Sequence, residues 1–142
     1  MDSTAYSPFI LGPFRVRVRT FELRDAARDR FFPCEIWLPV SEAPPSSGYP
    51  LVVFSHHAGG NRRSATFLCN HLASHGYVVA SLDHSEVVAK ELGPRAGETA
   101  AARAARVDAI VGSRVPDVRF LIDCRLAPAA AITRDPEYST SI

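Results

Sequence analysis

The segment Ser55–Gly60 (SHHAGG) combines polar side chains and glycines that can bring protein groups up to a reacting oxygen atom. Its two glycines let the backbone turn sharply and present N–H groups to a bound oxygen. The segment directly follows the apolar run Leu51–Phe54. Because ligands of open parallel sheets collect at the carboxyl ends of the strands, we expect a ligand-facing turn at 55–60.

The residues around this turn predict a strand–helix–strand unit. The runs Leu51–Phe54 and Tyr77–Leu82 are almost continuously apolar, as is typical of parallel strands covered on both faces. Between them lies one apolar helical stripe, made of Ala65, Leu68, Cys69, Leu72 and Ala73. Asn61 or Ser64 is expected to cap the start of this helix. Gly76 is expected to end the helix in the left-handed backbone conformation.

Two segments before this unit alternate apolar and polar side chains. Phe14–Arg19 alternates apolar residues with arginines, and Phe32–Leu38 has an apolar residue at every second position. This period of two indicates half-buried strands, which we expect to pair antiparallel. The charged stretch Arg24–Arg30 is expected to connect them by more than a tight turn, and Ser41–Tyr49 is expected to be a surface loop.

The part of the chain after the unit is predicted to be mainly helical. Residues 84–97 are expected to form an irregular loop. Ala100–Val111 is rich in alanine and ends at Gly112, and Pro116 fits the first turn of another helix. Residues 127–142 show no clear element. The predicted fold class is therefore α/β, an antiparallel strand pair followed by a parallel strand–helix–strand unit.

Composition limits the classes of function. The chain has 142 residues, which suits one domain, and its net charge of +1 gives no indication of nucleic-acid binding. No apolar run approaches the roughly 20 residues that span a bilayer, and the first ten residues lack a secretory-signal pattern. The three cysteines share no short spacing, which argues against disulfides or zinc. We expect a cytoplasmic globular protein without a metal, a cofactor, or a nucleic-acid or membrane partner.

Several short motifs resemble the α/β-hydrolase superfamily, and within it the predicted dienelactone hydrolases and the platelet-activating-factor acetylhydrolases. In that group a strand–Ser-His-Gly–x-Gly turn leads into a helix ending in Leu-Ala-x-x-Gly-Tyr-x-Val. Residues 55–59 and 72–79 match these two motifs, Asp83-His84 matches the Asp-His that ends the next strand, and 114–118 matches a later Arg-x-x-Asp-Val. The resemblance covers residues 14–126 and is most specific over 51–84.

The resemblance implies a serine esterase fold with a Ser-His-Asp triad and an oxyanion hole, acting on a small carboxylic ester or lactone without a metal or organic cofactor. One oxyanion donor of the family comes from the loop after the third strand, and this implies the backbone N–H of Ala58. Ser55 and His56 would shape the turn. His57 stands where the family has Gly, so a positive φ there would strain the backbone.

The motif of the family's nucleophile, Gly-x-Ser-x-Gly, occurs nowhere in the sequence. In family order the nucleophile, acid and base follow the helix that begins near Pro116. We therefore expect residues 1–142 to be a single incomplete hydrolase domain that supplies half of the oxyanion hole, lacks the triad and is inactive alone. The strand 51–54 would then be an exposed apolar edge through which copies of the chain self-associate.

Two other classes of function stay open. Gly59–Ser64 places small residues and the cations Arg62 and Arg63 at a predicted helix N-terminus, which suits an anion- or nucleotide-binding module. The chain can also be a non-catalytic remnant of a hydrolase.

Three further groups of residues are interpreted as structural. His71 and His75 lie on one helix face but lack the carboxylate of a zinc-binding motif. Asp83-His84-Ser85 has the residue types of a triad, but neighbouring side chains at a strand end diverge and are not expected to form a relay. Cys69 is expected to be a small buried apolar residue.

Overall fold

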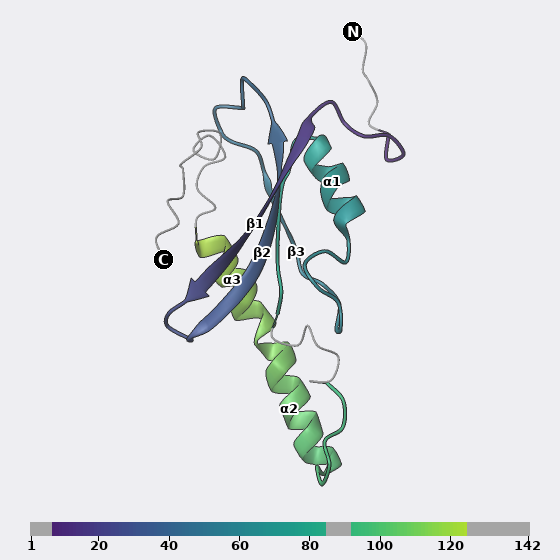
Figure 1. The fold of residues 1–142 in the computed structure, drawn as a ribbon, viewed down its shortest axis with the longest axis vertical. Coiled ribbons are helices and arrows are strands. Elements are labelled where there is room, and N and C mark those ends of the chain that lie inside the picture. The colour runs from purple at the N-terminus through teal and green to yellow at the C-terminus, as the bar shows by residue number, and fades with distance from the viewer. Residues whose placement is uncertain (1–6, 85–91, 125–142) are drawn as a thin grey trace.

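The computed structural model describes residues 7–84 and 92–124. It contains a four-stranded mixed sheet with helices packed against it. Along the chain the elements are β1 (Arg15–Asp25), β2 (Arg30–Val40), β3 (Leu51–Phe54), α1 (Thr66–Ser74), β4 (Val78–Leu82), α2 (Ala100–Gly112) and α3 (Arg114–Asp123). The sheet order is β1-β2-β4-β3 (Figure 1). β3 and β4 are parallel, and β2 pairs antiparallel with both β1 and β4. The predicted α/β fold class is confirmed.

The predicted antiparallel pair is present, but its strands are longer than the alternation indicated. Pairing runs without a break from Arg15↔Val40 to Asp25↔Arg30. The connection is therefore the turn at 26–29, which is longer than a two-residue tight turn, as expected, but shorter than the segment 24–30. The reason lies in Asp25, whose Oδ1 accepts hydrogen bonds from the backbone N–H groups of Ala27 and Arg28 at 3.0 and 3.2 Å and so closes the turn.

The two faces of the sheet carry separate apolar clusters. On one face Trp37 and Val79 pack with Cys69 and Ala73 of α1. On the other face the neighbouring positions of β2 and β4 pack around Leu121 of α3, and the buried members are Phe32, Cys34, Ile36, Leu38, Val78, Ala80, Leu82 and Leu121. Successive residues of a strand point to opposite faces, so α1 and α3 cover opposite sides. All five residues of β4 are buried, as the continuous apolar run predicted.

The helix between the parallel strands ends as predicted but begins later. Gly76 has φ +91°, the left-handed conformation expected after the helix. The helix starts at Thr66 with Ala65 as its N-cap residue, and no side chain caps it. Asn61 and Ser64 instead hydrogen-bond the backbone of the preceding turns: Ser64 Oγ accepts from Asn61 N–H at 2.9 Å, and Asn61 Oδ1 accepts from Arg63 N–H at 2.8 Å. These local bonds compete with helix formation over 61–64.

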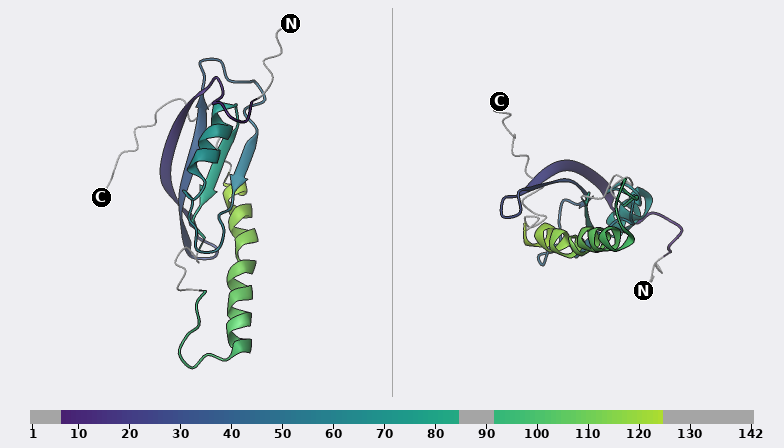
Figure 2. Two further views of the ribbon diagram at one scale, coloured as in Figure 1. Left: turned by 90° about the vertical axis from the view of Figure 1, so that its right-hand side faces the viewer. Right: turned by 90° about the horizontal axis from the view of Figure 1, so that it is seen from below.

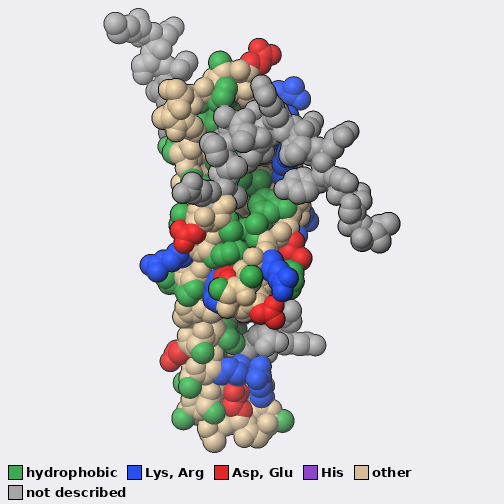
Figure 3. Space-filling model, turned by 90° about the vertical axis from the view of Figure 1, so that its left-hand side faces the viewer, with side chains coloured by type: hydrophobic (Ala, Val, Ile, Leu, Met, Phe, Trp, Pro, Cys, Tyr) green, Lys and Arg blue, Asp and Glu red, His purple; other side chains and the backbone are tan. Residues whose placement is uncertain are grey.

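The α2 helix extends beyond the end of the sheet (Figures 1 and 2). Thr99 caps it through a 3.1 Å hydrogen bond from Ala102 N–H to Thr99 Oγ1, and none of its residues is buried. Pro116 lies in the first turn of α3, as predicted. On the face shown in Figure 3, basic and acidic side chains are interspersed. Of the helices in the described ranges, none has the length and apolar character needed to cross a bilayer. The predicted irregular tail, 127–142, lies outside the described residues.

Candidate functional site

The turn predicted after β3 is present at the carboxyl edge of the parallel strands. The carbonyl oxygen of His57 accepts a hydrogen bond from Gly60 N–H at 2.9 Å, and Gly59 has φ +77°. A left-handed residue at the third position of such a turn defines a type II turn, with Ala58 at the second. A side chain at Gly60 would lie 2.8 Å from Ser64 Oγ, so this glycine allows the close approach of the following residues.

The anticipated strain at His57 does not arise. The left-handed position of the turn falls on Gly59, and Asp29 is the one described non-glycine residue with a positive φ. The His57 ring instead donates from Nδ1 to the carbonyl oxygen of Ala58 at 2.9 Å. His57 is exposed, so its side chain projects from the turn rather than supporting it.

Ala58 is exposed, and its backbone N–H makes no hydrogen bond with any of the described residues. An oxyanion donor must have this property, because an N–H already bonded within the protein cannot receive a substrate oxygen. The geometry is therefore compatible with the expected role of Ala58.

The neighbouring His56 is fully buried, and its side chain hydrogen-bonds the turn and the backbone of His84. Its Nδ1 donates to the carbonyl oxygen of His57 at 2.8 Å, and its Nε2 accepts the backbone N–H of His84 at 3.1 Å. One ring nitrogen must carry the proton and the other must not, so these two bonds require neutral His56 with the proton on Nδ1. The side chain of Arg114, from α3, donates to the carbonyl oxygen of His56.

A serine, a histidine and an aspartate form one hydrogen-bonded chain at this edge. Ser55 Oγ lies 3.0 Å from Nε2 of His84, and Nδ1 of His84 lies 2.9 Å from Oδ2 of Asp117. The side chains of His84 and Asp117 are completely buried, whereas Ser55 is exposed. A carboxylate can only accept, so the proton of neutral His84 sits on Nδ1 and Nε2 accepts from the serine hydroxyl.

Two arginines of the β1–β2 hairpin pair with Asp117. Nη1 of Arg28 and Nη1 of Arg30 each lie 2.8 Å from Asp117 Oδ1. Arg28 also donates from Nε to Asp25 at 2.6 Å, and this side-chain hydrogen bond lowers the pKa of the Asp25 carboxyl. The buried carboxylate of α3 thus has two guanidinium partners at one oxygen, as burial of a charge requires.

Sequence reasoning missed this chain of contacts. The expectation that Asp83 and His84 diverge holds: Asp83 pairs with Arg62, whereas His84 points to Asp117 on α3. Ser85 lies outside the described residues. The partners of His84 come from another strand end and another helix, and the usable signal was that β3 and β4, being parallel, must end at one edge.

The two cations of the proposed anion-binding segment are both engaged by carboxylates. Arg62 pairs with Asp83, and its backbone N–H donates to Asp83 Oδ1 at 2.6 Å. Nε of Arg63 lies 2.6 Å from Oε2 of Glu35. The helix begins after this segment, at Thr66, so 59–64 is not a helix N-terminus.

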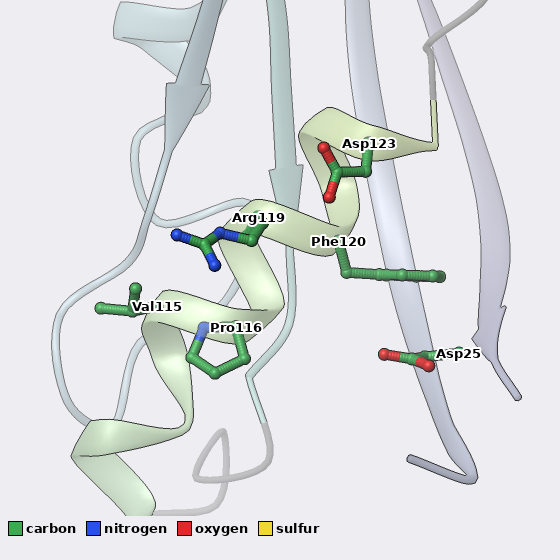
Figure 4. A pocket seen from close by; sticks show the side chains of 6 residues that line it. All are labelled: Asp25, Val115, Pro116, Arg119, Phe120 and Asp123. Atoms are coloured by element: carbon green, nitrogen blue, oxygen red, sulfur yellow. The ribbon is translucent and has the colours of Figure 1, made fainter. Parts of the chain in front are cut away.

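Other candidate positions lie away from the edge. The rings of His71 and His75 are 4.6 Å apart, and His75 Nε2 donates to the carbonyl oxygen of Ile10 at 3.1 Å. Among the residues placed in the structure, no group of His, Cys, Asp or Glu is arranged to hold a metal ion. A pocket beside α3 is lined by Asp25, Val115, Pro116, Arg119, Phe120 and Asp123 (Figure 4), none of which belongs to the 55–60 turn.

Comparisons with known proteins identify the fold. Residues 31–92 match the family model described as platelet-activating factor acetylhydrolase, isoform II. The ferulic acid esterase of Streptomyces cinnamoneus superposes with a TM-score of 0.59 at 23% identity, over 81% of this chain and 47% of that one. The chain has an α/β-hydrolase fold. A hypothetical protein from Pseudomonas aeruginosa has a TM-score of 0.41 at 17% identity, over 48% of this chain and 21% of that one.

The family match covers part of the described site. The family model covers the 55–60 turn and His84, and it ends before α3, which carries Asp117. The chain spans about half the length of the esterase that it resembles, 47%.

Proposed function

We propose that this chain is part of a serine carboxylic-ester or lactone hydrolase and that the backbone N–H of Ala58 is one donor of its oxyanion hole. The observation that carries the proposal is that Ala58 is an exposed residue whose N–H has no hydrogen bond to any described residue, in a type II turn at the carboxyl edge of β3. The family match and the fold support the reaction class.

In the proposed reaction a serine attacks the ester carbonyl carbon. Residues 1–142 do not supply this serine. The carbonyl oxygen becomes an anion in the tetrahedral intermediate, and Ala58 N–H donates to it. The residue after the nucleophile would provide the second donor. Loss of one such donor raises the barrier by about 2.7–4 kcal/mol. Since the nucleophile and base are supplied elsewhere, residues 1–142 alone are not expected to turn over small esters efficiently.

The proposal is tested on residues 1–142 by titration with methylphosphonate, a tetrahedral anion that mimics the intermediate. We expect the backbone amide resonances of Ala58 and Gly59 to move in ¹⁵N NMR spectra. Ala58→Pro removes the N–H and should abolish this response. Ala58→Gly keeps the N–H and should retain it. Wild-type amide resonances that do not shift on titration would contradict the proposal.

The same titration separates the alternative function. An anion-binding module built on 59–64 predicts that the largest changes fall on Asn61–Ser64 and survive Ala58→Pro. The pairing of Arg62 with Asp83 and of Arg63 with Glu35 argues against that result, because both cations already have anionic partners.

A further inference from the structure

His84 contacts the 55–60 turn at two consecutive residues. Its Nε2 lies 3.0 Å from Ser55 Oγ, and its backbone N–H donates to His56 Nε2 at 3.1 Å. Ser55 and His56 are the residues that immediately precede the turn His57–Gly60. His84, which follows β4, therefore holds the two residues before the turn. It contacts Ser55 through its side chain and His56 through its backbone N–H.

With a neutral ring, the hydrogen bonds around His84 have one consistent set of proton positions. Asp117 requires a proton on Nδ1 of His84, which leaves Nε2 to accept from Ser55 in the neutral ring. His56 likewise carries its proton on Nδ1 and accepts at Nε2. Without the carboxylate, the His84 proton could move to Nε2, and the ring could then no longer accept from the serine.

Asp117 is in turn held by elements far from the turn. Its partners Arg28 and Arg30 come from the β1–β2 hairpin. Asp117 itself lies on α3, as does Arg114. Arg114 reaches the turn directly through the carbonyl oxygen of His56. The position of the 55–60 turn thus depends on a buried polar network that joins the hairpin, α3 and the end of β4.

We infer that His84 is a positioning residue: with Asp117 it fixes the turn so that the Ala58 N–H stays aimed at the oxyanion. This inference rests on the proposed function. A nucleophilic Ser55 is the competing interpretation of the same contacts. Two features favour positioning. Asp117 Oδ1 is bound by two guanidinium groups that tie it to the β1–β2 hairpin, as suits a residue that holds parts of the fold together. Ser55 also lies on the same short segment as the proposed donor, where its hydroxyl can anchor the turn.

The experiment compares three variants of residues 1–142. Ser55→Ala removes the anchor hydroxyl. His84→Asn keeps an N–H for Asp117 but cannot reach Ser55, whereas His84→Gln keeps a polar group near Ser55 but loses the N–H at the Nδ1 position. Ser47→Ala is the matched control, because Ser47 is also an exposed serine and lies in a loop away from the site.

We expect ¹⁵N relaxation to show order parameters for Ala58 and Gly59 near the rigid value of about 0.85 in wild type and in Ser47→Ala, falling below about 0.6 in Ser55→Ala and His84→Asn. His84→Gln should fall between these limits. Long-range ¹⁵N spectra of wild type should show His56 and His84 protonated on Nδ1. Melting temperatures should stay close to wild type in Ser55→Ala.

Three results would overturn the inference. One is a rigid turn in both Ser55→Ala and His84→Asn. Another is an His84 ring protonated only on Nε2. The third is covalent labelling of Ser55 by an aryl fluorophosphonate, lost in His84→Asn, which would make Ser55 a nucleophile. If the variants loosen the turn but methylphosphonate does not bind, the positioning role stands and the oxyanion function fails.

Discussion

Nη1 of Arg30 lies 2.8 Å from Oδ1 of Asp117, and this pair joins the start of β2 to the first turn of α3. The Asp117 side chain is completely buried, whereas that of Arg30 keeps 22% of its surface exposed. The same carboxylate bonds His84, which contacts the 55–60 turn. Packing of α3 on the sheet is therefore coupled to the geometry of the candidate site.

Replacement of Asp117 by Ala should destabilise the fold by about 3–5 kcal/mol, because it leaves two guanidinium groups and an imidazole N–H without their shared acceptor. Urea denaturation followed by circular dichroism measures the change. Asp123→Asn, an exposed position on the same helix, is the control and should change stability by less than about 0.5 kcal/mol. Equal effects of the two variants would contradict the role of Asp117.

Ala58→Pro should leave the free energy of unfolding within about 1 kcal/mol of wild type. Ala58 occupies the second position of a type II turn, where proline is favoured, and its N–H has no acceptor among the described residues. Thermal denaturation tests this. A large loss of stability would mean that the Ala58 N–H has a bond within the protein, and that it is not free for a substrate.

Acid should weaken the packing of the segment before α2 through Glu98. Its hydrogen bond from the Arg106 side chain lowers the pKa of Glu98 from 4.5 to about 2. A lowered pKa in the folded state contributes stability above about pH 4.5, which is lost as the pH falls toward 2. Glu98→Gln should therefore lower the urea midpoint at pH 7 and have little effect near pH 2. An equal effect at both values would contradict this origin.

The β3 edge is the proposed site of self-association. β3 and β1 are the two edges of the described sheet, but β1 carries alternating arginines, whereas β3 reads Leu-Val-Val-Phe. Leu51 is 41% exposed, so Leu51→Lys should fold and should shift the chain toward monomer in light scattering. Val18→Lys, on the already charged β1 edge, is the control and should not. A wild-type chain that is monomeric in light scattering would contradict this proposal.

The three cysteines should differ in reactivity toward a thiol reagent. Burial raises the pKa of Cys34 to about 12 and that of Cys69 to about 11, while Cys124 is exposed. Iodoacetamide at pH 8 should therefore modify Cys124 first, and the other two should react only after denaturation. Mass spectrometry of digested protein gives the order. Rapid modification of Cys69 in the native state would contradict its burial between α1 and the sheet.

Local sequence patterns predicted the elements that carry the site. Continuous apolar runs predicted the parallel strands β3 and β4, although β4 is fully buried whereas β3 is not, and Gly76 marked the end of α1 through its backbone conformation. The start of α1 was misplaced because Asn61 and Ser64 bond nearby turns, a choice that side-chain type alone does not determine.

The sequence by itself indicated the turn, since Gly59 can adopt the positive φ that a type II turn requires, and family resemblance made Ala58 a candidate oxyanion donor. Only the tertiary structure decided that Ser55, His84 and Asp117 lie in one hydrogen-bonded chain and that Arg28 and Arg30 pair with the aspartate. These residues are far apart along the chain, up to 89 positions for Arg28 and Asp117. Their contacts arise from the pairing of β3 with β4 and the packing of α3, which no local pattern encodes.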